Sequence, residues 1–318
     1  MWLNEYGYPY YRITFIIHRM YQPKHIPRSE FVPVRTLNYH VLVWGEPVPG
    51  QAPLVMVHGW MDVAASWQFV VDALTQGRHV IAPDWRGYGL TQAPPADNYW
   101  FPDYLADLDF LLDHYAAEQP VDLVGHSMGG NIVMMYAGVR PARVRRLINL
   151  EGFGMARTEP AEAPARYAKW MDELKTLHRG ELALKPYADS AGVARRLMKT
   201  NPRLPADKAA WLATHWARAN AQGQWEILGD PAHKIINANL YQVDEALQML
   251  SRISAPTLAV EAGENSLDKW WDGKYTLAEY RERIKSVPDL RIGTIQDAGH
   301  MLHHDQPEEL AAMIEAFL

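Results

Sequence analysis

Residues 121–139, VDLVGHSMGGNIVMMYAGV, contain the clearest indication of the fold class. Its first five residues form a short, mostly apolar run, which is typical of a strand buried on both faces of a parallel sheet. The pattern over 128–139 predicts a helix that ends before Pro141. Between strand and helix stands GHSMG at 125–129, a G-x-S-x-G motif in the setting that a strand–turn–helix elbow requires.

Ser127 is the candidate nucleophile of this motif. A sharp turn puts the middle residue in a strained backbone conformation, and glycines two positions before and after it let strand and helix approach closely. The serine hydroxyl then lies near a helix N-terminus, where the amides favour negative charge. The other interpretation is a glycine-rich turn with an N-capping serine.

Outward from this motif, strand and helix patterns alternate, which predicts right-handed βαβ units and a mostly parallel sheet, the α/β class. The first two strands are expected to form an antiparallel pair joined near Asn38. The expected strands are 31–37, 39–44, 53–57, 79–83, 121–125, 147–150, 257–261 and 290–295, and the expected helices of this part are 67–74, 102–115, 128–139 and 307–318.

The alternation of strand and helix patterns stops after Gly152. No convincing strand run appears there, and helices are expected at 165–178, 206–219 and 242–250. We therefore predict one α/β core interrupted by a helical cap. The predicted parts are an N-terminal aromatic extension at 1–30, a core at 31–152 and 250–318, and a cap insertion at 153–249.

The N-terminal extension has an unusual concentration of aromatic side chains. An arm of this kind packs on the core, on a partner subunit or on a membrane surface, or it forms a poorly ordered tail. The sequence therefore leaves a homodimer open. The aromatic residues are Trp2, Tyr6, Tyr8, Tyr10, Tyr11, Phe15 and Tyr21.

The amino-acid composition argues against several classes of protein function. The chain has 318 residues, a formal net charge of −6 and a pI of about 6.1, so no basic excess points to nucleic acid as a partner. It has no cysteine, which excludes disulfides and thiolate chemistry. No apolar run approaches the roughly 20 residues that span a bilayer, and no signal peptide is evident. We expect a cytoplasmic protein that needs no cofactor.

Acyl transfer to a serine requires two N–H donors aimed at the developing oxyanion and a base for the hydroxyl. The backbone amides of Met128 and Trp60 are the expected donors, because Trp60 ends the HGW segment that follows an earlier strand. His300 follows the last expected strand, and Gly299 lets that loop turn toward Ser127. His303 and His304 compete for the role. No H-E-x-x-H pattern accompanies this histidine cluster, so we expect no metal.

Four segments together carry a family resemblance: HGW at 58–60, DWRGYG at 84–89, GHSMGG at 125–130 and DAGHMLHHDQPEEL at 297–310. From Phe31 to the C-terminus the chain resembles the α/β-hydrolase superfamily, and its serine esterases in particular. The resemblance implies an eight-stranded sheet with a helical cap over the active site. Haloalkane dehalogenases and epoxide hydrolases of this superfamily use Asp where this chain has Ser127, which argues against those chemistries.

The acid that orients His300 is where the chain departs from the pattern of the superfamily. The usual position, Gly-x-x-Asp after the penultimate strand, holds Ser266, and Asp268 lies two residues later. A second position used in the superfamily follows the strand after the nucleophile helix, and it holds Glu151. We favour Glu151, because a carboxylate at the mouth of a buried strand is costly unless paired. Asp268 is the alternative acid. In the structural interpretation, Glu151 caps a helix or forms a salt bridge at the hinge of the inserted helical cap.

These residues predict a serine hydrolase that acts on a small or medium carboxylic ester through an acyl-enzyme on Ser127. A C–C bond hydrolase, an amidase or a lactonase with the same residues is the alternative, and a non-catalytic binding protein of the same fold is a third reading. The aromatic and methionine residues of the insertion are candidates for an apolar acyl pocket: Met155, Trp170, Met171, Trp211, Trp216 and Trp225.

Overall fold

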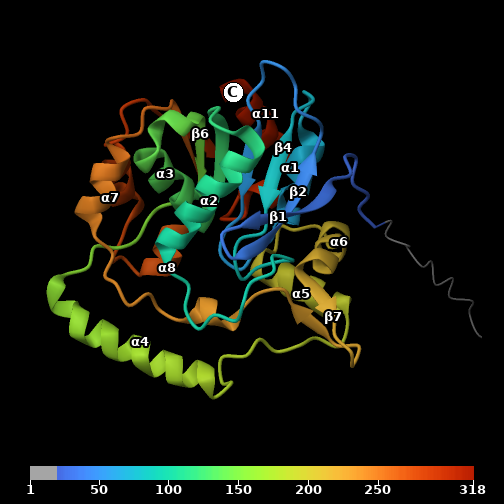
Figure 1. Cartoon of the computed structure of the whole chain (residues 1–318), viewed down its shortest axis with the longest axis vertical. Coiled ribbons are helices and arrows are strands. Elements are labelled where there is room, and N and C mark those ends of the chain that lie inside the picture. Colours follow the sequence, from blue (N-terminus) through green and yellow to red (C-terminus); the bar gives the residue numbers. More distant parts are fainter. Residues whose placement is uncertain (1–19) are drawn as a thin grey trace, which may run out of the picture.

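A computed structural model describes residues 20–318 and shows one eight-stranded sheet with helices on both faces (Figure 1). The strand order is β1-β2-β4-β3-β5-β6-β9-β10, in which β1, β2 and β4 pair antiparallel and all other neighbours pair parallel. The strands are β1 (Arg28–Val34), β2 (Leu37–Trp44), β3 (Leu54–Val57), β4 (Val80–Pro83), β5 (Val121–His126), β6 (Val144–Leu150), β9 (Thr257–Ala262) and β10 (Leu290–Ile295). The predicted α/β fold and eight-stranded sheet are confirmed.

One predicted turn is wrong. The β1–β2 hairpin turns at residues 35–36, with Val34 opposite Leu37, and not near Asn38. Arg35 has a φ of 55° there, a conformation that a tight hairpin needs. Arginine is not a residue type that indicates a positive φ, so the sequence did not predict this turn. Asn38 instead pairs with Gln92 in an isolated bridge.

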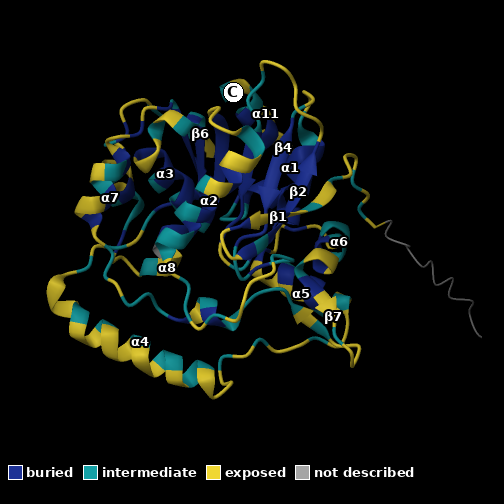
Figure 2. Ribbon diagram, viewed as in Figure 1, coloured by how far each residue is buried: buried dark blue, intermediate teal, exposed yellow. Residues whose placement is uncertain are grey.

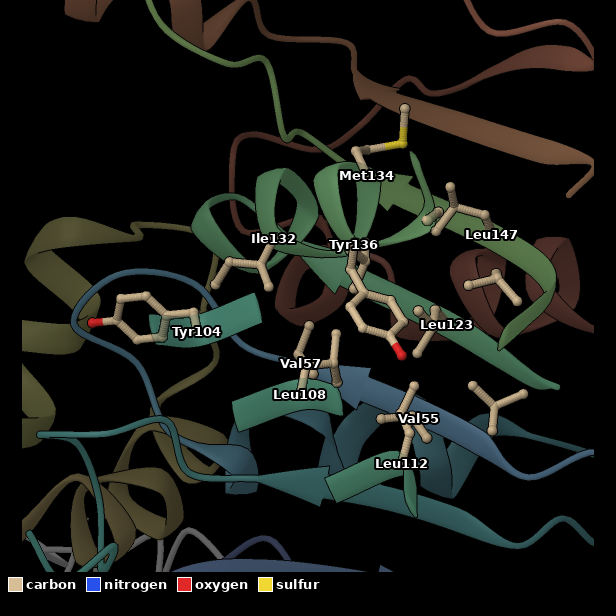
Figure 3. Packing of buried hydrophobic residues seen from close by; sticks show 14 of the residues in the cluster. Val55, Val57, Tyr104, Leu108, Leu112, Leu123, Ile132, Met134, Tyr136 and Leu147 are labelled. Atoms are coloured by element: carbon tan, nitrogen blue, oxygen red, sulfur yellow. The ribbon is translucent and has the colours of Figure 1, made fainter. Parts of the chain in front are cut away.

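Two apolar clusters lie on opposite faces of the sheet. One contains side chains of α2 (Phe101–Ala116) and α3 (Met128–Val139) packed on β3, β5 and β6 (Figure 3). Side chains of α9 (Leu277–Ile284) belong to the same cluster. The other contains α1 (Gln68–Ala73), α10 (Leu302–Asp305) and α11 (Pro307–Phe317). Because both faces are covered, the central strands are apolar throughout, as the sequence pattern predicted.

The segment between β6 and β9 is built from three different pieces. Helices α5 (Ser190–Thr200) and α6 (Ala206–Trp216) join the second apolar cluster, while α7 (Val243–Leu250) packs on α3. Helix α4 (Ala163–His178) lies along the edge of the molecule and has no buried residue (Figure 2). This part of the chain is therefore not a single compact layer.

A short hairpin in this segment corrects the expectation that it has no strand. Strands β7 (Ala217–Ala219) and β8 (Trp225–Ile227) pair antiparallel, so the predicted helix 206–219 ends at Trp216. Three-residue strands are too short for an alternating pattern, and tertiary pairing overrides the helix propensity of alanine here. Helices α5, α8 (Ser266–Trp271) and α9 were not predicted.

The N-terminal extension is described only from Met20 onward. Tyr21 packs edge-to-face on Phe69 and Trp211 at 5.0 and 5.4 Å, so this one aromatic residue of the extension lies against the core. The other predicted aromatic residues lie outside the described residues. Across 20–318, none of the helices combines the length and the apolar character that crossing a bilayer demands.

Candidate active site

Ser127 occupies the elbow between β5 and α3, with φ 54° and ψ −116°. This is a strained conformation for a residue with a side chain, and such strain persists only where the surroundings enforce it. The two flanking glycines do so by close packing. A Cβ on Gly125 would lie 2.3 Å from the carbonyl oxygen of Gly129, and one on Gly129 would lie 2.4 Å from that of Val57. The predicted elbow is therefore present.

Glu151 lies directly after β6 and also has a positive φ, 56°. Its amide donates to the carbonyl of Val260 at 3.1 Å. The side chain of Asn149 closes the turn, because its Nδ2 donates to the carbonyl of Gly152 and its Oδ1 accepts the Gly152 amide. These bonds aim the Glu151 side chain across the carboxyl end of the sheet.

The Glu151 carboxylate is buried and has three partners. It accepts the Ala262 amide at 2.7 Å and the hydroxyl of Ser266, and its Oε2 lies 3.3 Å from Nδ1 of His300. Burial raises the pKa of Glu151 to about 7, while the Ser266 and Ala262 hydrogen bonds act to lower it. The structure thus brings Glu151 and His300 together, and it gives Ser266 a hydrogen-bonding role that the sequence did not suggest.

His300 lies in the loop after β10, as predicted. Burial lowers the pKa of its imidazole to about 3, so the ring is the free base at neutral pH. Because Nδ1 faces Glu151, Nε2 is the nitrogen left to accept a proton. The indole of Trp270 packs edge-on against this ring at 4.3 Å, a contact that sequence reasoning missed.

The competing residues are placed elsewhere. His303 and His304 are only 1% and 2% exposed, and His303 faces Asp62 rather than Glu151. The side chain of Asp268, the alternative acid, lies outside what the structure describes. Among the described residues, His300 is the histidine beside the Glu151 carboxylate.

The segment that carries the expected oxyanion donors lies against the elbow. A Cβ on Gly59 would come within 3.1 Å of the Cβ of Ser127, so the HGW loop passes directly beside the serine. Trp60 and Met128 both line the same cavity as Ser127. The Trp60 indole donates to the carbonyl of His233 at 3.2 Å, which ties this loop to the segment that precedes α7.

A cavity of about 680 Å³ opens over Ser127 and Glu151. Its wall is mainly apolar, and Arg166 and Arg283 are its cationic members. Of the six residues predicted for an acyl pocket, Met155 lines the cavity. Trp170 and the other four are not among its lining residues. Trp211 packs on Phe69, Trp216 donates to Asp62, Trp225 packs against the second apolar cluster and Met171 is 48% exposed. The apolar wall instead comes from α2, α3, α7 and the α8–α9 region, including Phe101, Leu105, Met135, Leu247, Trp270 and Trp271.

Comparison with known proteins shows the family of this chain. The family model of the alpha/beta hydrolase fold matches residues 52–307, so the chain belongs to the α/β-hydrolase family. A serine hydrolase-like protein of Danio rerio is 26% identical over 296 residues, covering 91% of this chain and 88% of the relative. Epoxide hydrolase A of Mycobacterium tuberculosis is 26% identical, covering 92% and 97%. A thioesterase domain from the curacin biosynthetic pathway has the same fold, with a TM-score of 0.76, 23% identity and coverage of 91% and 99%. The protein is a hydrolase of this family.

Proposed function

We propose that this protein is a serine hydrolase that cleaves small or medium carboxylic esters through an acyl-enzyme on Ser127. The observation that carries the proposal is the shared cavity: Ser127 and Glu151 line it together, and the Glu151 carboxylate holds His300 at 3.3 Å. Glu151 therefore shares a cavity with Ser127 and contacts His300, which supports a triad built from three separate segments. A chain with Ser rather than Asp at the elbow does not match the superfamily's epoxide hydrolases.

In the proposed reaction His300 accepts the hydroxyl proton as Ser127 attacks the carbonyl carbon of the ester. Glu151 holds Nδ1–H and stabilises the imidazolium that forms. The backbone amides of Trp60 and Met128 receive the oxyanion, and the N-terminus of α3 adds its dipole. His300 then protonates the leaving alcohol. In the second half of the reaction, His300 accepts a proton from the water that attacks the acyl-enzyme, and it returns this proton to Ser127.

The volume and the wall of the cavity support an ester with an apolar acyl group. About 680 Å³ accommodates a substrate of drug-like size, and pockets of this kind gain most of their affinity from burying apolar surface. An ester is neutral, so its carbonyl region needs no charged partner in the cavity other than the catalytic groups.

Labelling with a fluorophosphonate tests the nucleophile. We expect one label per chain on wild type, none on Ser127→Ala, and a loss of at least about 10⁴-fold in kcat on p-nitrophenyl esters for that variant. A series of p-nitrophenyl esters of rising chain length then defines the acyl group. Absence of labelling on wild type, or equal labelling of Ser127→Ala, would overturn the proposal.

A further inference from the structure

A second group of polar side chains lies beneath the candidate active site and takes no part in the proposed reaction. Asp62, His126 and His303 each offer one oxygen or nitrogen atom, and these three atoms lie within 4.8 Å of one another. All three side chains are at least 97% buried. Carboxylate and imidazole are the ligands that zinc and related divalent cations prefer when thiolates are absent.

The hydrogen bonding of this group is incomplete. Within residues 20–318, Nδ1 of His126 and Oδ2 of Asp62 are buried without a hydrogen-bond partner. Buried polar atoms without a partner are costly, so two such atoms in one group call for a missing partner. The other carboxylate oxygen of Asp62 is fully used, because it accepts the Val63 amide, the Ser66 hydroxyl and the Trp216 indole.

The distances suit a cation better than a direct contact. Nε2 of His303 lies 3.6 Å from Oδ2 of Asp62, which is too long for a hydrogen bond. Two ligand atoms on a tetrahedral zinc, at about 2.0–2.1 Å from the metal, are about 3.4 Å apart. His126 also has the second hydrogen bond typical of a ligand histidine, since its Nε2–H donates to the carbonyl of His300 at 2.7 Å and leaves the lone pair on Nδ1.

We propose that Asp62, His126 and His303 bind one divalent transition-metal ion, with Zn²⁺ as the reference ion. The three ligands come from the three segments that carry the candidate site. Asp62 lies two residues after Trp60, His126 directly before Ser127 and His303 three residues after His300. The ion therefore cross-links the oxyanion loop, the elbow and the base loop without touching the reacting groups.

Metal binding by the full-length protein, stripped with a chelator, tests the proposal. We expect one Zn²⁺ per chain by elemental analysis and calorimetry, a visible spectrum of four-coordinate Co²⁺ when cobalt replaces zinc, and a rise in Tm of about 5 °C at 100 times Kd. Asp62→Asn and His303→Gln should each weaken binding at least about 100-fold and abolish the cobalt spectrum.

His178→Gln is the matched control. His178 lies 3.7 Å from Asp97 in a similar His–Asp pair, but both side chains are more than half exposed. This variant should bind zinc with the affinity and stoichiometry of wild type. The proposal is overturned if wild type binds no zinc tighter than about 10 µM, or if both ligand variants, folded by circular dichroism, bind it as wild type does. Either result would assign the unpaired atoms to buried water.

Discussion

The elbow region and helix α4 face the same cavity but are held very differently. Around Ser127, strand, helix and loop approach so closely that a single added Cβ would clash, and the strand β5 that leads into the elbow is buried along its whole length. Helix α4 contributes Arg166 to the cavity, yet none of its residues is buried. Its connections to the segment before α7 are polar: Arg166 donates to the Asn237 carbonyl, and Glu173 accepts the Ile236 amide.

Under the proposed function, this difference separates the reacting groups from the wall that selects the substrate. Chemistry depends on positions held to a fraction of an ångström, which a packed sheet and its loops provide. Substrate selection needs only a wall of suitable shape, and a helix held by a few hydrogen bonds can change in sequence at little cost to stability. The following predictions test this division, beginning with the largest effect.

The first prediction concerns the acid within the packed region. Glu151→Gln should lower kcat by about 10³–10⁴ with little change in KM, because the amide no longer stabilises the His300 imidazolium. Steady-state kinetics on the best p-nitrophenyl ester measure this. Asp268→Asn is the matched control and should keep kcat within about threefold. The reverse outcome would make Asp268 the acid.

The second prediction concerns packing under the elbow. Leu123 is fully buried on β5 in the cluster of Figure 3, four residues before Ser127. Leu123→Ala should lower the free energy of unfolding by about 2–5 kcal/mol, because it removes apolar contacts and leaves a cavity in a rigid core. Urea denaturation gives the value. A loss below about 1 kcal/mol would mean that the core relaxes around the gap.

The third prediction is a pH dependence of stability. Burial raises the folded-state pKa of Glu151 from 4.5 to about 7, so folding favours its protonated form. The stability contributed by this group is therefore present below pH 4.5 and is lost as the pH rises through 7. The free energy of unfolding of Glu151→Gln minus that of wild type should therefore increase by about 2 kcal/mol as the pH rises from 5 to 8. Tm values measured across this range provide the check, and a constant difference would contradict it.

The smallest effect is expected in α4. Met171 is 48% exposed, so Met171→Ala should change the free energy of unfolding by less than about 0.5 kcal/mol. The same denaturation experiment as for Leu123→Ala makes the two values directly comparable. A loss above about 1 kcal/mol would show that α4 packs on the body of the protein in solution, and the contrast between the two regions would fail.

Local patterns alone predicted the elements that carry the reacting groups. Buried parallel strands are continuous apolar runs, and G-x-S-x-G after such a run has few other structural explanations. Ser127, Glu151 and His300 could therefore be proposed from the sequence, since Ser127 and Glu151 directly follow recognisable strands and His300 lies in the loop after the last one. The residues of the cavity wall could not be predicted in this way. The sequence does not distinguish an aromatic residue that faces a cavity from one that packs on neighbours in its own helix.

Periodicity and turn chemistry are local, so the amino-acid sequence was enough to predict the fold class, the elbow at Ser127 and the segments that carry the proposed base and acid. Which side chains contact one another became visible only in the folded chain. It brought Ser266 onto the Glu151 carboxylate and Trp270 onto the His300 ring. It also gathered Asp62, His126 and His303 beneath the elbow. Contacts between residues far apart in the sequence depend on packing and register, which no local pattern records.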